Sequence, residues 1–196
     1  SSFVLDPADE RVALRWVGGA TAPQLARLLD DGRAAVAAGG TASGKHAPES
    51  PAAATLAHAD DAYGRADYAA AAAAYHDALA KAPADWPRYG RAVESLLYAL
   101  QQTDAFEQGA QRALEAYPRL PRTPATANIA ASGLDCALSL PREHPRRAEF
   151  VAALDRIART VVDDRGIPMA ADDRSGVYIA LLSARAVFAA ETGKLA

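Results

Sequence analysis

Apolar and polar positions alternate differently in the first and later parts of the chain. Two β-prone runs, Phe3–Leu5 and Val12–Val17, flank a turn rich in Pro and Asp, which predicts a β-hairpin. Gly18–Gly19 end the second run, and Pro23 stands in the first turn of a segment whose leucines recur at helical spacing. Residues 1–37 are therefore expected to form a β-β-α unit.

The pattern changes after residues 38–52, which combine Gly, Ser and Pro without apolar periodicity and so have the composition of a linker. From 53 to 193, apolar residues recur at helical spacing in alanine-rich segments separated by short breaks. Asp67 and Thr103 are positioned to cap the helices that follow them. The pattern predicts helices at 53–65, 67–82, 87–102, 104–117, 124–139, 144–164 and 174–192.

Residues 62–83 place small and aromatic side chains at regular positions in two neighbouring helices. Ala59 and Ala71 are small enough for the helices to approach closely, Tyr68 and Tyr75 fill the space between them, and the closing proline ends the unit. This segment resembles a tetratricopeptide repeat. The later helix pairs keep the helix-turn-helix layout without the signature spacing.

The repeat resemblance implies a mainly α fold of antiparallel helix hairpins, preceded here by the short β-β-α unit. Ala66 departs from the family, which usually has Gly at this turn. A generic helical bundle is the alternative, because alanine-rich amphipathic helices imitate such repeats.

The same resemblance implies a binding surface. In tetratricopeptide proteins the first helix of each pair lines a concave groove, and by register with that family Leu56, Asp60 and Tyr63 would face it, with Glu94 and Tyr98 as approximate counterparts in the second pair. Aromatic and acidic groups together can bind an extended segment of a partner or one of the protein's own helices. A solvated face is the alternative.

The first 37 residues are similar to the C-terminal part of a thioredoxin-like domain. The similarity consists of a strand ending at Leu5, an antiparallel strand closing on Gly18–Gly19, and a helix from Pro23. It implies that the Cys-x-x-Cys motif and the cis-proline of that family would lie upstream of Ser1. The order thioredoxin-like then tetratricopeptide-like is a known pairing in bacterial proteins.

These resemblances favour a protein-interaction or scaffold module that is the non-catalytic part of a larger thioredoxin-like protein. The alternative is a portion of a thiol-disulfide oxidoreductase whose redox motif lies upstream. The partner is expected to be a polypeptide or the protein's own thioredoxin-like half. Because a half-domain leaves strand edges unpaired, the hairpin is expected to pack either on the helical domain or on a second copy of the chain, which would be self-association. Ser1 is not a methionine and residues 194–196 look like the start of a vector-encoded tag linker, so the natural N-terminus is expected further upstream.

Charge and hydrophobicity indicate which kinds of partner and cellular location the sequence favours. The chain has 196 residues and a net charge of −3, with 21 basic and 24 acidic residues mixed along its length, so we expect no nucleic-acid partner. The longest apolar runs fall short of the roughly 20 residues of a membrane span. The sequence therefore indicates a soluble protein. It leaves the compartment open, with the cytoplasm favoured, because a targeting signal would lie upstream of Ser1.

Motifs that carry chemistry are weak in this sequence. Residues 39–46 come close to a phosphate-binding loop, but His46 replaces the hydroxyl that would hold Mg²⁺, and a linker is the preferred interpretation. The single cysteine, Cys136, is expected to be buried and structural rather than reactive. The aspartate pairs 163–164 and 172–173 are expected to cap helix ends and form local ion pairs, with a cation or acid/base site as the alternative. No catalytic residue, metal site or cofactor is expected.

Overall fold

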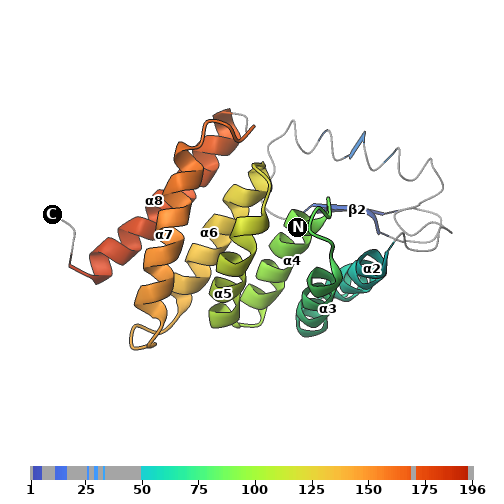
Figure 1. The fold of residues 1–196 in the computed structure, drawn as a ribbon, viewed down its shortest axis with the longest axis horizontal. Helices are drawn as coiled ribbons and strands as arrows, with labels where there is room; N and C mark the ends of the chain where they lie inside the picture. Colours follow the sequence, from blue (N-terminus) through green and yellow to red (C-terminus); the bar gives the residue numbers. More distant parts are fainter. Residues whose placement is uncertain are drawn as a thin grey trace.

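The computed structural model describes residues 2–5, 12–16, 26, 29, 30, 33, 50–168 and 171–193, and this part of the chain is mainly α-helical (Figure 1). The helices are α2 (Pro51–Gly64), α3 (Tyr68–Lys81), α4 (Tyr89–Gln102), α5 (Phe106–Ala116), the short 3₁₀ helix η1 (Tyr117–Arg119), α6 (Pro124–Ser139), α7 (Arg147–Asp163) and α8 (Ala171–Glu191). The prediction of a mainly α protein is confirmed, and the helix boundaries lie close to the predicted ones.

The N-terminal strands form a small antiparallel sheet. Strand β1 (Ser2–Leu5) pairs with β2 (Val12–Trp16), with a register shift between Val4 and Leu5. The helix expected after them falls largely outside the described residues, so the complete β-β-α unit stays a prediction. Residues 38–49 of the predicted linker, with their phosphate-loop-like motif, and residues 194–196 also lie outside the described residues.

Helix α2 begins two residues earlier than predicted. The Ser50 side chain accepts a hydrogen bond from the Ala53 N–H (3.2 Å), and Pro51 occupies the first turn. The serine side chain accepts from one of the free N–H groups at the start of a helix. The proline ring fixes φ at a value that suits the first turn. The pair that looked like the end of a linker is therefore the cap of the first helix.

Asp67 caps α3, as predicted from the sequence. Its carboxylate accepts a hydrogen bond from the Ala70 N–H (3.1 Å). The Asp67 N–H in turn donates to the Ala62 carbonyl (3.0 Å), which closes the end of α2. Ala66 between them has a φ of 58°. This is the left-handed region, in which glycine is favoured over alanine.

The turn between α4 and α5 has the same geometry. The Ala105 N–H donates to the Leu100 carbonyl (2.9 Å), and Asp104 has a φ of 54°. Thr103 does not cap α5, so that prediction is wrong: its hydroxyl donates back to the Ala99 and Leu100 carbonyls (both 3.1 Å) at the end of α4. Because the left-handed Asp104 follows it, α5 begins only at Phe106.

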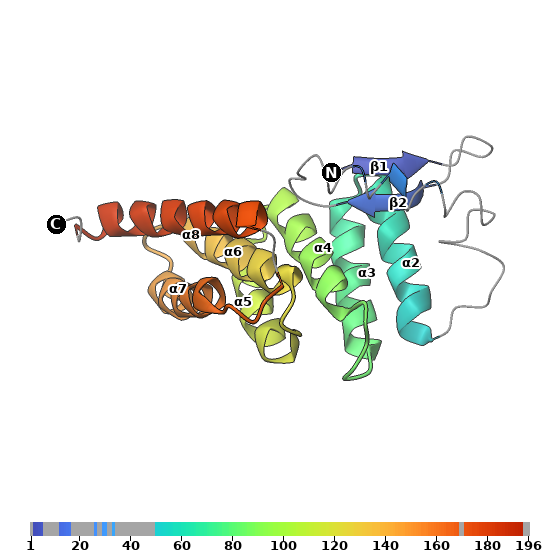
Figure 2. The same cartoon turned by 90° about the horizontal axis from the view of Figure 1, so that it is seen from above.

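The helices stack as antiparallel neighbours in two layers. Helix α6 packs against α4, α5, α7 and α8. Figure 2 shows α4, α6 and α8 on one side of the molecule and α5 and α7 on the other. Small residues make this approach possible: a Cβ added at Gly109 of α5 would lie 2.5 Å from the Cys136 Sγ of α6.

The core contains the positions that the repeat resemblance singled out. Ala59, Ala71 and Ala78 are fully buried, and the Tyr75 ring lies among them without exposed surface. The close pairing of α2 and α3 therefore rests on alanines at the contact and on one large ring that fills the remaining space.

Candidate functional site

The junction between α4 and α6 is joined by two side-chain hydrogen bonds. The Asn128 Nδ2 donates to Glu94 Oε1 (2.8 Å), and the Gln101 Nε2 donates to Asp135 Oδ2 (3.0 Å). In both bonds the partners are 34 residues apart. The second bond lies two helical turns after the first on each helix. The two helices therefore run parallel, with equivalent positions side by side.

A groove of about 540 Å³ adjoins this junction and runs between α6 and α8. Its polar side chains include Ser132 and Asp135 from α6 and Ser183 from α8, with Gln101 at its α4 edge. Its apolar surface includes Val187, whose side chain is 52% exposed. A mixed surface of this kind can contact both the backbone and the side chains of an extended segment.

The carboxylates at the junction are shifted toward their neutral forms. Burial raises the pKa of Glu94 from 4.5 to about 7, while the Asn128 hydrogen bond and the Arg91 charge act in the opposite direction. Burial also raises the pKa of Asp135, and the hydrogen bond from Gln101 lowers it. Each carboxylate therefore has a neutral amide, and no cation, as its hydrogen-bonded partner across the junction.

The residues predicted from the sequence are partly brought together. Asp60 accepts from the Tyr75 hydroxyl (2.7 Å) and pairs with Arg91 of α4 (2.6 Å). The Tyr98 ring lies 5.4 Å from the Tyr63 ring, measured between centroids. These contacts link α2 to the same face of α4 that carries Glu94.

Two predicted residues do not lie on an open surface. Leu56 is 1% exposed and Tyr63 is 2% exposed, and both belong to the main core. The Tyr63 ring is enclosed by those of Tyr68 and Tyr98, at centroid distances of 5.4 Å each. The aromatic ring of α2 therefore packs in the core, because α3 and α4 both contact this side of α2.

Sequence reasoning missed Gln101, Asn128, Ser132 and Asp135. A usable signal was present, since Asn128 and Ser132 stand 34 residues after the predicted Glu94 and Tyr98. The 34-residue period of tetratricopeptide repeats, applied from α4 to α6, would have extended the predicted surface to α6.

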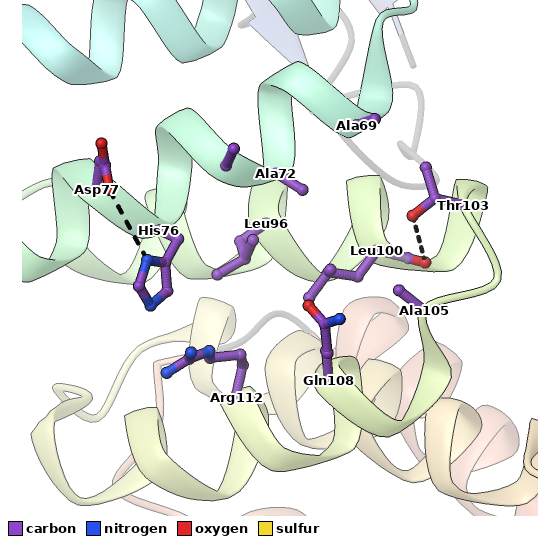
Figure 3. Close-up of a pocket in the computed structure, with 11 residues that line it drawn as sticks. Ala69, Ala72, His76, Asp77, Leu96, Leu100, Thr103, Ala105, Gln108 and Arg112 are labelled. Carbon is purple, nitrogen blue, oxygen red and sulfur yellow. Dashed lines mark hydrogen bonds and ion pairs between the residues drawn. The ribbon is translucent and has the colours of Figure 1, made fainter.

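A second groove, of about 570 Å³, lies on the other layer, between α3 and α5 (Figure 3). Leu96 and Leu100 of α4 contribute to its lining, and alanines line the α3 side. His76 and Arg112 approach it from opposite helices. Each has an acid on its own helix: Asp77 lies 3.9 Å from the imidazole, and Glu115 lies 2.6 Å from the guanidinium. The described lining of this groove therefore contains one cationic side chain, Arg112, and one anionic side chain, Asp77.

Cys136 is buried, as predicted, and its thiol is not paired in a disulfide. Burial first, and then the neighbouring Asp135 charge, raises the pKa of the thiol to about 12. A nucleophilic cysteine needs a lowered pKa and access to solvent. The structure gives Cys136 neither of these properties.

The loop after α7 is held by charged contacts. The Asp164 carboxylate pairs with Arg122 and accepts from the Gly166 N–H (2.8 Å), and these hydrogen bonds lower its pKa. Arg174 donates to the Val162, Asp164 and Ile167 carbonyls (3.4, 3.2 and 2.7 Å). Within the described ranges, no group of three or more His, Cys, Asp or Glu side chains is placed to hold a metal ion.

Comparison with known proteins gives no assignment: no protein-family model, curated protein or solved structure matches this chain. None of the helices in the part described by the structure is long and apolar enough to cross a membrane. Function has to be argued from the geometry of the α4, α6 and α8 face.

Proposed function

We propose that this chain is a protein-interaction module that binds an extended segment of a polypeptide partner along the face formed by α4, α6 and α8. The proposal rests above all on the two hydrogen bonds at the α4–α6 junction, whose partners are 34 residues apart. This separation equals the length of a tetratricopeptide repeat. In such repeats the first helices stack in parallel and line an extended concave surface.

The groove offers both hydrogen-bonding groups and apolar surface to a bound peptide segment. Serine, glutamine and carboxylate groups in and beside it can hydrogen-bond to a peptide backbone, and the exposed Val187 and half-buried Leu138 can contact its apolar side chains. Helices α4 and α6, which carry the two junction hydrogen bonds, line this face together with α8. The predicted residues Asp60, Glu94 and Tyr98 extend it toward α2.

A peptide library displayed on phage, followed by affinity measurement with fluorescent peptides, tests this proposal. Ser183→Arg places a long side chain in the groove and is expected to weaken binding at least about tenfold by steric exclusion. The matched control is Ala152→Arg on the exposed side of α7. We expect it to leave the dissociation constant within about twofold. Equal effects of the two arginines, with both variants folded, would overturn the proposal.

We propose further that the module is the non-catalytic part of a larger thioredoxin-like protein. The antiparallel pairing of β1 and β2 is compatible with the end of such a domain. The rival proposal, a thiol-disulfide oxidoreductase with its motif upstream of Ser1, places no chemistry on Cys136. Reading the sequence of the longer protein for Cys-x-x-Cys discriminates between the two, and an insulin-reduction assay of this chain is expected to show no activity.

A further inference from the structure

The described lining of the α6–α8 groove contains one anionic side chain and no cationic one. Among the residues described as lining it, Asp135 is the ionisable one, and the remaining polar groups are serines and Gln101. Glu94 adds a second carboxylate two helical turns earlier along the junction. Arg91, three residues before Glu94 on α4, pairs with Asp60 at 2.6 Å.

Glu94 is half-buried and Asp135 is exposed in the groove, and no described cation forms an ion pair with either carboxylate. Each accepts a hydrogen bond from a neutral amide across the junction, at 2.8 Å for Glu94 and 3.0 Å for Asp135. A carboxylate that has lost water is stabilised strongly by a charge-assisted hydrogen bond from an ammonium or guanidinium group. The oxygen lone pairs of Glu94 and Asp135 that the amides do not occupy therefore favour binding of a positively charged group of the ligand.

We infer that the segment bound on this face is basic, with a Lys or Arg side chain of the partner pairing with Asp135 in the groove and a second pairing with Glu94. This inference rests on the proposed function, because it specifies the chemistry of the polypeptide. Two helical turns cover about 10 Å. An extended chain covers that distance in about three residues. The two basic side chains are therefore separated by about two to four positions.

The test uses short acetylated and amidated peptides of Ala, Ser and Leu that differ only at two positions, which carry Lys, Gln or Glu. Fluorescence polarisation with the full chain measures their dissociation constants at low and high salt. The Lys peptide is expected to bind about tenfold more tightly than the Gln peptide. This advantage should shrink as salt is added, because screening weakens the charge pairs. The Glu peptide is expected to bind more weakly than either.

Asp135→Asn and Glu94→Gln keep the size of each side chain and its amide partner while removing the charge. Each is expected to reduce the advantage of the Lys peptide over the Gln peptide about threefold, so that the two changes together remove most of it. Ser183→Arg is the control for the site, since it should weaken all three peptides.

The outcomes separate the two proposals. If the Lys and Gln peptides bind equally and Ser183→Arg weakens both, the groove binds peptides but the basic partner is wrong. If no peptide responds to Ser183→Arg, the proposed function fails as well. If light scattering shows a dimer that Ser183→Arg dissociates, the occupant is a second copy of this chain, and the basic segment is again overturned.

Discussion

At the scale of single residues, the structure gives the Glu94 carboxyl a pKa that its place in the sequence does not predict. Its carboxyl sits between α4 and α6, half-buried, with Asn128 as its hydrogen-bonded partner. Periodicity alone marks it as a polar position on a helix. The contact with α6 turns it into a group whose pKa lies near neutrality.

We expect the stability of the protein to fall as pH rises from about 4.5 to about 7. In this window the unfolded chain releases the Glu94 proton while the folded protein retains it, so ionisation favours unfolding. Above about pH 7 this contribution is constant. Glu94→Gln removes it and should stabilise the protein by about 2 kcal/mol at pH 8, with the difference vanishing below pH 4.5.

Urea unfolding at a series of pH values measures this effect. Asn128→Ala provides a second variant, because loss of its hydrogen bond should raise the Glu94 pKa further and extend the decline to higher pH. A difference between Glu94→Gln and the unchanged protein that is the same at every pH would contradict the prediction.

At the scale of elements, the two similar turns show how the chain accepts a residue in an unfavourable conformation. Ala66 and Asp104 both have positive φ and both follow a helix closed by a hydrogen bond to a carbonyl five residues earlier. Aspartate tolerates this region better than alanine does. The two turns therefore store different amounts of backbone strain.

Ala66→Gly is expected to stabilise the protein by about 0.5 to 1 kcal/mol. Relief of the left-handed strain contributes about 1 to 2 kcal/mol, and the greater freedom of glycine in the unfolded chain offsets part of it. Asp104→Gly is the matched variant and should gain less. Chemical denaturation of both variants checks the order, and a less stable Ala66→Gly would show that the strain is absent.

Gly133→Ala tests the close packing of α6 on its neighbours. The added Cβ would clash with the Ala113 Cβ and lie 3.0 Å from Leu154 Cδ2, so we expect a loss of about 1 to 3 kcal/mol. Gly64→Ala is the control, since no atom lies within 4 Å of the added Cβ. It should be neutral or gain up to about 1 kcal/mol from helix propensity. Equal stability of the two variants would mean that α6 can shift without cost.

At the scale of the whole molecule, the N-terminal sheet is small for an independent structure. In the part of the chain that the structure describes, it consists of β1 and β2 alone, and a two-stranded sheet is marginal in water. Unpaired strand edges favour association with another chain.

We therefore expect the molar mass measured by light scattering to rise with protein concentration. Deleting residues 1–37 should abolish this rise while the helical signal in circular dichroism persists. A monomer at every concentration, with unprotected amides in both strands by hydrogen exchange, would contradict self-association through the hairpin.

The sequence by itself determined where most helices run and which small residues lie between them. Helix ends depend on local groups such as Asp67 and the prolines, which can be recognised within a short window. Ala59 and Ala71, expected at the helix contact from the repeat resemblance, are buried. The tertiary structure alone decided that Thr103 closes a helix instead of opening one, because its role depends on the backbone angle of the next residue. It also decided that Leu56 is buried and that Asn128 meets Glu94. The register between helices is set by side chains from distant segments packing together, which no local pattern reports.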